Sequence, residues 1–250
     1  MKKFFICSDI HGYYKELIES LKEAKFDSSN SNHVFVSCGD LLDRGKEPLE
    51  CLRFVNSLPN KILIKGNHED LMEEMLNRGY YQLHDLHNGT VQTISDIVDK
   101  HGFYSDNEFK EACEKVRTNE DYSTYVNSLV DYYETKNYVF VHGYIPCVEE
   151  RKSGSFTTYN PDWRNAVEED WEKSRWYPGW NLWEDNIKEP NKTIVCGHWH
   201  CSAPNYYVHH QGRNQYDITT PFVDEGIVCI DACTAHSHRV NCYVVEDEEL

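Results

Sequence analysis

One short pattern, repeated five times, most constrains how this chain can fold: an apolar run ends and an Asp, Asn or His follows within a few residues. The runs occupy residues 4–7, 34–38, 62–64, 138–141 and 193–196. Short runs rich in β-branched and aromatic residues, without alternating polarity, are typical of strands buried on both faces. In open α/β sheets the functional site lies just beyond the carboxyl ends of the strands, so we expect the five polar ends to converge.

Two segments with helical periodicity separate the first three runs. Residues 14–26 place Leu17, Leu21 and Ala24 on one face, and residues 47–58 repeat the arrangement with Leu49 and Leu52. The first seventy residues therefore predict a β-α-β-α-β unit with parallel strands and right-handed crossovers.

The remainder of the chain predicts one α/β domain over residues 1–250, with two additions. Residues 69–136 are polar and rich in tyrosine, and they predict a helical insertion that walls the site, with helices near 90–101, 107–116 and 122–135. Residues 147–190 hold five of the six tryptophans and predict an irregular aromatic rim with one helix near 161–174. Residues 226–231 and 240–245 predict strands that close a second sheet.

Composition excludes several classes of partner. The formal charge is −17, from 42 acidic against 25 basic residues, which argues against nucleic acid or an anionic membrane as a partner. No apolar stretch has the length of a signal core or a membrane span, so we expect a soluble, cytoplasmic protein. Cys7, Cys38, Cys196 and Cys229 lie inside apolar runs, which favours reduced core cysteines over disulfides.

The polar residues at the run ends form a donor set of oxygen and nitrogen atoms without thiolate. They are Asp9, His11, Asp40, Asn67, His142, His198 and His200. Such a set favours Mn²⁺, Fe²⁺ or Zn²⁺, with Mn²⁺ our first expectation. Seven ligands are too many for one ion, but with one shared carboxylate they make two four-ligand sites. A pair of bridged metals is suited to in-line displacement at phosphorus.

The motifs that carry these donors resemble the signature of the calcineurin-like metallophosphoesterase superfamily. They are, in order, Asp9-x-His11, Gly39-Asp40-x-x-Asp43-Arg44-Gly45, Gly66-Asn67-His68-Glu69, His142 and Gly197-His198-x-His200. The second and third motifs are similar to those of bacterial and phage protein serine/threonine phosphatases. The resemblance implies a sandwich of two mixed β-sheets flanked by helices.

The resemblance also implies the distribution of ligands and catalytic roles. The first metal would be held by Asp9, His11, Asp40 and His200, and the second by Asp40, Asn67, His142 and His198, with Asp40 as the bridge. Eukaryotic members of the phosphatase branch usually lack the counterpart of His200. His68 would be the general acid, oriented by Asp43, while Arg44 would bind phosphate with help from Asn67. Arg175 is the expected second basic group for phosphate, with Arg164 behind it.

Three functions fit these residues. The first is hydrolysis of phosphomonoesters by a protein serine/threonine phosphatase, with a phosphorylated protein or a small phosphoester as substrate. The alternative is a dinucleoside polyphosphate hydrolase of the diadenosine tetraphosphate type. The second alternative is a metal-binding scaffold without catalysis, which the presence of His68, Asp43 and Arg44 disfavours. The acidic surface disfavours a nuclease.

Overall fold

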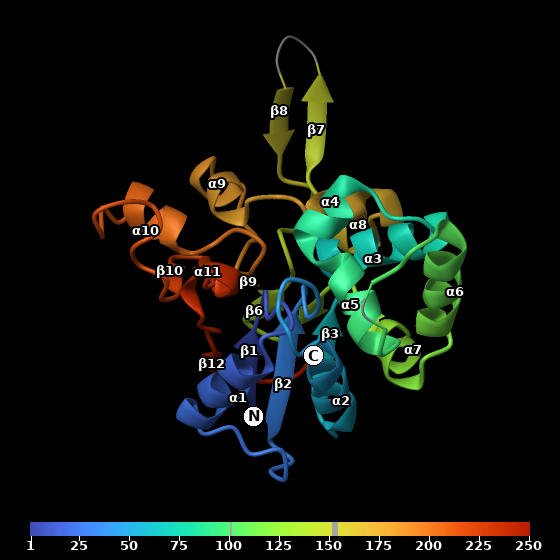
Figure 1. Ribbon diagram of the computed structural model, residues 1–250. Helices are drawn as coiled ribbons and strands as arrows, with labels where there is room; N and C mark the ends of the chain where they lie inside the picture. Colours follow the sequence, from blue (N-terminus) through green and yellow to red (C-terminus); the bar gives the residue numbers. More distant parts are fainter. Residues whose placement is uncertain (101, 152–154) are drawn as a thin grey trace.

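The computed structural model describes residues 1–100, 102–151 and 155–250. Two five-stranded mixed sheets pack face to face, and helices cover their outer faces (Figure 1). This α/β sandwich is the fold expected from the sequence. The five strand ends that carry the proposed ligands belong to both sheets.

The first sheet has the strand order β12-β1-β2-β3-β4. Its four parallel strands are β1 (Lys2–Cys7), β2 (His33–Cys38), β3 (Lys61–Ile64) and β4 (Leu129–Val130). Helices α1 (Tyr14–Glu23) and α2 (Pro48–Ser57) make the two crossovers, so the structure contains the β-α-β-α-β unit expected from the sequence.

The second sheet has the order β10-β11-β9-β6-β5. Its centre is parallel and consists of β6 (Tyr138–Phe140), β9 (Thr193–Cys196) and β11 (Ile227–Cys229). The antiparallel edge strands are β5 (Tyr133–Glu134) and β10 (Phe222–Asp224).

The last strand, β12 (Tyr243–Asp247), corrects one expectation. Residues 240–245 were expected to close the second sheet, but β12 pairs antiparallel with β1 in the first sheet. Val245 packs between the two sheets while Val244 packs against the helix-covered core. Both faces of the strand therefore find apolar partners beside β1.

The core between the sheets explains why the strand runs lack alternation. Phe4 and Ile6 of β1 point toward the second sheet, where Phe140 and Val195 lie, whereas Phe5 points to the helices on the outer side. Since the central strands are covered on both faces, most positions along them are apolar.

The helical insertion lies between β3 and β4. Its helices are α3 (Asn67–Arg78), α4 (Leu83–Asn88), α5 (Thr90–Ile97), α6 (Asp106–Arg117) and α7 (Glu120–Val126). The helix expected over residues 122–135 was wrong beyond residue 126, because that stretch supplies β4 and β5, whose backbone groups pair in the two sheets. Residue 101, the expected end of another helix, lies outside the described residues.

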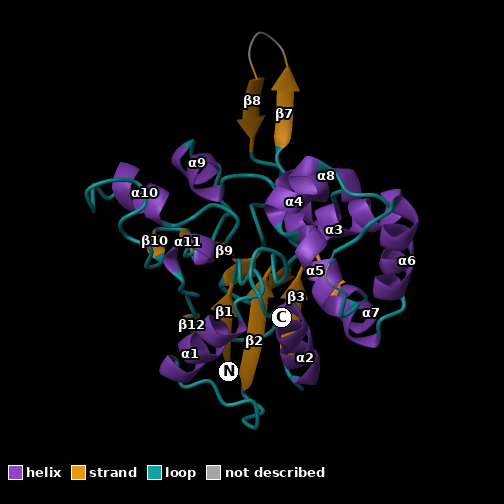
Figure 2. Cartoon of the chain, in the orientation of Figure 1, coloured by secondary structure: helices purple, strands orange, loops and turns teal. Residues whose placement is uncertain are grey.

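The aromatic rim is more regular than expected. A hairpin of β7 (Val148–Arg151) and β8 (Ser155–Thr158) stands out from the body in Figure 2, and residues 152–154 between its strands lie outside the described residues. A 3₁₀ turn (Trp163–Asn165), α8 (Glu168–Ser174) and α9 (Gly179–Glu184) follow. The expected helix over 161–174 is thus limited to its second half. Two short helices follow later in the chain: α10 (Ser202–Tyr207) lies after β9, and α11 (Thr234–Ser237) lies between β11 and β12.

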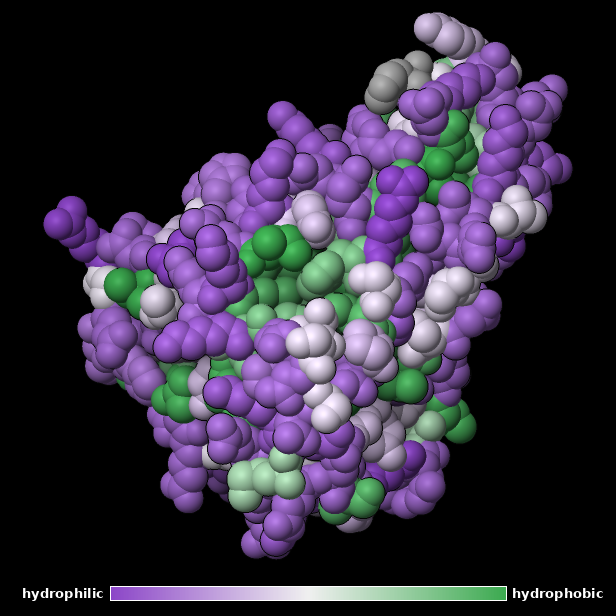
Figure 3. All heavy atoms as spheres, turned by 90° about the horizontal axis from the view of Figure 1, so that it is seen from below, coloured by the Kyte–Doolittle hydropathy of each residue, from purple (hydrophilic) through white to green (hydrophobic). Residues whose placement is uncertain are grey.

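The surface agrees with the composition. The face shown in Figure 3 is mainly hydrophilic. Among the described residues, no helix has both the length and the apolar character needed to cross a membrane.

Candidate metal centre and active site

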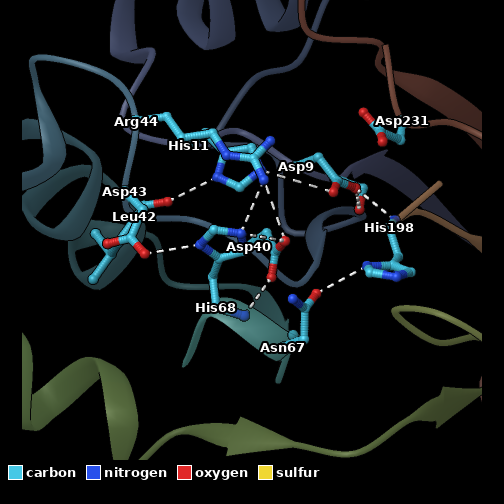
Figure 4. Close-up of polar contacts among 12 residues, drawn as sticks. Asp9, His11, Asp40, Leu42, Asp43, Arg44, Asn67, His68, His198 and Asp231 are labelled. Atoms are coloured by element: carbon cyan, nitrogen blue, oxygen red, sulfur yellow. Dashed lines mark hydrogen bonds and ion pairs between the residues drawn. The ribbon is translucent and has the colours of Figure 1, made fainter. Parts of the chain in front are cut away.

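The strand ends of both sheets meet at one place, where Asp9, Asp40, Asn67 and His198 face one another (Figure 4) and His142 lies beside Asp40. Two groups of possible ligand atoms form there: His11, Asp40 and His68 make one, and Asp40, His142 and His198 make the other. Asp40 belongs to both groups. Asp40 is the residue that the resemblance implies as the bridging ligand, and this role stays a prediction.

The backbone at these strand ends is unusual. Asp9, His11, Asp40 and His198 have φ values between 51° and 62°. Residues other than glycine rarely adopt this left-handed conformation, and such strained residues cluster at functional sites. The strain is consistent with a backbone shaped to aim side chains rather than to continue a regular element.

Glycines let the strand ends approach one another closely. A Cβ atom at Gly66 would lie 2.2 Å from Oδ1 of Asp40, and one at Gly197 would lie 1.8 Å from Oγ of Ser8. Any larger residue would push the first sheet away from its own ligand loops or from the second sheet. This explains why Gly precedes the ligand at both positions.

The four ligands proposed for the second metal lie close to one another. Oδ1 of Asn67 lies 2.8 Å from Nε2 of His142 and 2.9 Å from Nδ1 of His198, and Nε2 of His142 lies 3.4 Å from Oδ1 of Asp40. Nδ1 of His142 donates to the carbonyl oxygen of Cys38 at 2.7 Å. Because a carbonyl can only accept, this bond leaves Nε2 as a lone-pair donor, the arrangement typical of metal-binding histidines.

Three of the four ligands expected for the first metal lie together. Nε2 of His11 is 3.7 Å from Asp40 and 4.0 Å from Asp9, while its Nδ1 contacts the carbonyl of Leu42 at 3.0 Å. Asp9 also accepts hydrogen bonds from the Ser8 hydroxyl and the His198 N–H. His200 is not in either group of ligand atoms; its Nδ1 lies 3.0 Å from the Ser202 hydroxyl.

The protonation of these groups fits divalent cations. Burial, aided by His142 and His68, lowers the pKa of His198 to about 3, and burial lowers the pKa of His11 well below its usual range. Burial, with Asp9 and Glu69 nearby, raises the pKa of Asp40 to about 6. Metal ligands must be neutral imidazoles and ionised carboxylates, so binding of a divalent cation would use the neutral form of His11 and His198 and would favour the ionised form of Asp40.

His68 is held by a carboxylate that is itself held by the helical insertion. Nδ1 of His68 lies 2.8 Å from Oδ2 of Asp43. Thr90 donates to Oδ2 of Asp43 at 2.8 Å, and Thr93 donates to Oδ1 at 2.9 Å. Burial alone would lower the pKa of His68, but Asp40 and Asp43 raise it to about 9. The imidazole is therefore fixed in orientation and able to hold a proton near neutral pH.

Arg44 joins this arrangement from the solvent side. Its Nη2 lies 3.1 Å from Nε2 of His68, and the residue is exposed. Its backbone is left-handed, with φ of 61°, and is packed against Gly89 of the insertion. The guanidinium is therefore available to a ligand at the metal centre.

Arg175 and Arg164 are placed differently from expectation. Arg175 is buried, and its guanidinium contacts Asp70, Asp131 and Glu168, with Nε donating to Asp70 at 2.9 Å. Arg164 donates to Glu134 and Glu189 at 2.7–3.0 Å. Since carboxylates occupy both guanidinium groups, the structure does not support either residue as the second phosphate ligand.

The sequence analysis assigned no role to two buried acids, Asp231 and Glu69. Asp231 follows β11 and lies beside Asp9 and His198 in Figure 4; burial, with Asp9 close by, raises its pKa well above the usual range. It obeys the same run-then-acid pattern, so that pattern could have identified it. Glu69 accepts from the backbone N–H groups of Asp40, Leu41 and Gly66. It holds the two ligand loops together.

A hollow of about 880 Å³ lies elsewhere, between α3, α7 and α8. Its described lining includes Glu69, Asp70 and Asp131 but neither His68 nor any proposed ligand. This hollow therefore does not contain the candidate metal centre.

Comparisons with known proteins give the family. The family model of calcineurin-like phosphoesterases matches residues 2–240, and the chain belongs to this family. A cold-active protein tyrosine phosphatase of a psychrophilic Shewanella species is similar in fold, with a TM-score of 0.56 at 15% identity over 98% of this chain and 76% of that one.

Curated relatives match shorter segments of this chain. The symmetrical bis(5'-nucleosyl)-tetraphosphatase of Coxiella burnetii is 38% identical over 96 residues, which are 38% of this chain and 32% of that protein. Serine/threonine-protein phosphatase 2 of Salmonella typhimurium is 41% identical over 68 residues, 27% of this chain and 30% of that protein. The matched part thus spans about a third of the length of these relatives.

Proposed function

We propose that the chain is a phosphoester hydrolase that works with two divalent cations. One observation carries the proposal: Asp40 is shared by two groups of ligand atoms, and His68, held by Asp43, lies in one of them. Asp9, His11 and Asp40 would hold one ion, and Asp40, Asn67, His142 and His198 the other. His200 remains a candidate fourth ligand of the first ion. Bound ions of this kind polarise a phosphate and lower the pKa of an attacking water.

Side chains of the protein would bind the phosphate and supply the proton for the leaving group. Arg44 would turn its guanidinium from His68 to the phosphate oxygens and bind them with its planar fork, offsetting the charge that develops there. His68 would donate the proton on its Nε2 to the leaving oxygen, while Asp43 holds Nδ1. Thr90 and Thr93 keep the Asp43 carboxylate in place. Asn67 would contribute both to metal binding and to substrate orientation.

For the substrate, we favour a symmetrical dinucleoside tetraphosphate, of the diadenosine tetraphosphate type. The relatives from Coxiella burnetii support this choice over the phosphoprotein that the motifs favour on their own. The second candidate is a phosphoserine or phosphothreonine protein, supported by the match to the Salmonella typhimurium phosphatase.

The deciding experiment compares kcat/KM for diadenosine tetraphosphate with that for a panel of phosphopeptides, on protein loaded with Mn²⁺. The proposal expects a clear preference for the dinucleotide, with ADP as the nucleotide product of symmetrical cleavage. A preference for the phosphopeptides would transfer the assignment to protein dephosphorylation.

The general acid is tested by His68→Gln, with His210→Asn as a control at an exposed histidine. Loss of general acid catalysis should lower kcat by roughly 10²- to 10⁴-fold while the metal content stays at the wild-type level. Full activity in His68→Gln would remove His68 from this role. A metal-loaded wild-type protein without activity on any phosphoester would favour the scaffold alternative.

A further inference from the structure

Three large, exposed aromatic side chains contact the proposed metal ligands His198 and His200. The exposed fractions are 48% for Trp176, 41% for Trp199 and 52% for Tyr216. Single exposed apolar residues are common on proteins, but a group of them beside a polar site marks a binding surface.

The three rings and two proposed ligands form a continuous row, which we call the ring row: Trp176, His198, Trp199, His200 and Tyr216. The ring of Trp176 meets the ring of His198 edge-on, with 5.7 Å between the centroids. Trp199 follows His198 in the sequence, and their ring centroids lie 6.4 Å apart. Trp199 stacks on His200 at 5.7 Å, and His200 lies 5.4 Å from Tyr216. The aromatic faces therefore begin directly at the proposed metal ligands.

The other tryptophans show that the exposure of these two is not the rule in this fold. Trp163, Trp171, Trp180 and Trp183 are all buried in the core of the second sheet, with at most 8% of their surface exposed. Trp176 of the rim and Trp199 after β9 are thus the two tryptophans that stay exposed while the other four are buried. A planar, uncharged ligand surface beside the phosphate site would cover them.

We propose that Trp176 and Trp199 bind a nucleobase of the substrate by stacking, while its phosphates occupy the metal centre. This inference rests on the proposed function, whose substrate class it deepens. Every base offers a π-face to an aromatic ring, and such stacking is a large, sequence-tolerant contribution to nucleotide binding. It also suits this chain, because a formal charge of −17 leaves little general attraction for a polyphosphate.

The test compares substrates with and without a base. Variants Trp176→Ala, Trp199→Ala, Trp176→Phe and Trp199→Phe are assayed against Tyr104→Ala, which removes a ring that is 89% exposed and outside the ring row. The readout is the KM for diadenosine tetraphosphate divided by the KM for inorganic tetraphosphate. Each Ala variant should raise this ratio by about tenfold, whereas Phe should restore most of it and Tyr104→Ala should leave it unchanged.

Titration calorimetry with ADP and with pyrophosphate, on Mn²⁺-loaded protein, separates this inference from the proposed function. The Ala variants should lose affinity for ADP relative to pyrophosphate even if the dinucleotide is not hydrolysed. Ratios equal to wild type in both experiments would overturn the inference, as would a wild-type protein that binds ADP no more tightly than pyrophosphate. A selective loss of kcat/KM on phosphopeptides would instead assign the rings to a protein substrate.

Discussion

Glu69 connects the two loops that carry Asp40 and Asn67, and Glu69→Gln tests how much this connection contributes. Its Oε2 accepts from the N–H groups of Asp40 at 2.9 Å and Gly66 at 2.7 Å. Its Oε1 accepts from the N–H of Leu41 at 3.1 Å and the hydroxyl of Tyr125 at 2.9 Å. The side chain is buried, so water cannot replace a lost bond.

The expected loss of stability follows from these four bonds. A glutamine keeps one acceptor oxygen, and its least costly placement sets the NH₂ group toward Tyr125, whose hydroxyl can turn and accept. The N–H of Leu41 then has no partner, which costs about 1–3 kcal/mol. The two bonds to Asp40 and Gly66 persist but become neutral, while the lower desolvation cost of an amide offsets part of that loss. The net effect is about 2 kcal/mol, or a melting temperature lower by roughly 4–8 °C for a chain of this length.

Thermal unfolding of metal-free protein, followed by circular dichroism, measures this loss. The matched control is Glu73→Gln on the same helix, where the side chain is 63% exposed and a change under about 0.5 kcal/mol is expected. Because the Asp40 loop loosens, Mn²⁺ affinity should also fall at least about tenfold in Glu69→Gln. Melting temperature and Mn²⁺ affinity both equal to those of the control would refute the role of Glu69.

Two further predictions concern the general acid and the rim. Asp40 and Asp43, against the effect of burial, raise the pKa of His68 from its ordinary 6.5 to about 9. In metal-free protein the protonated His68 therefore stabilises the folded state fully below pH 6.5, and this contribution disappears as the pH rises through about 9. The difference in unfolding free energy between wild type and Asp43→Asn should therefore be larger at pH 6 than at pH 10, and an equal difference at both would contradict the ion pair. Arg164→Ala removes the bonds to Glu134 and Glu189 and should lower stability by about 2 kcal/mol in denaturant titrations, with kcat/KM unchanged. Loss of activity at unchanged stability would instead return Arg164 to the phosphate site.

The parts of the site that the sequence predicts are those determined by short contiguous segments. An apolar run followed by a donor, as in residues 34–40, contains both the buried strand and the position of its end. The meeting of Asp9 with Asp40, and of His142 with His198, therefore follows from parallel strands within each sheet. Asp231 obeys the same rule after β11 and is predictable by extending it.

Other features depend on contacts between segments far apart in the sequence. The pairing of β12 with β1 joins the two ends of the chain, and no pattern within residues 240–245 chooses between two sheets that both offer apolar faces. Arg175 is surrounded by Asp70, Asp131 and Glu168, which come from α3, from beyond β4 and from α8. A sequence motif cannot show which distant carboxylates will form ion pairs with an arginine. The same holds for Thr90 and Thr93, which the insertion brings to Asp43.

The central claim is that strand ends from two sheets assemble one centre for two metal ions around Asp40. The most direct measurement is the number of Mn²⁺ ions per chain, determined by inductively coupled plasma mass spectrometry after loading and desalting. The proteins compared are wild type, Asp40→Asn and His68→Gln. Because Asp40 belongs to both groups of ligand atoms, we expect two ions in wild type and in His68→Gln, and fewer than one in a folded Asp40→Asn. One ion or none in wild type, or two ions retained in Asp40→Asn, would contradict the shared centre.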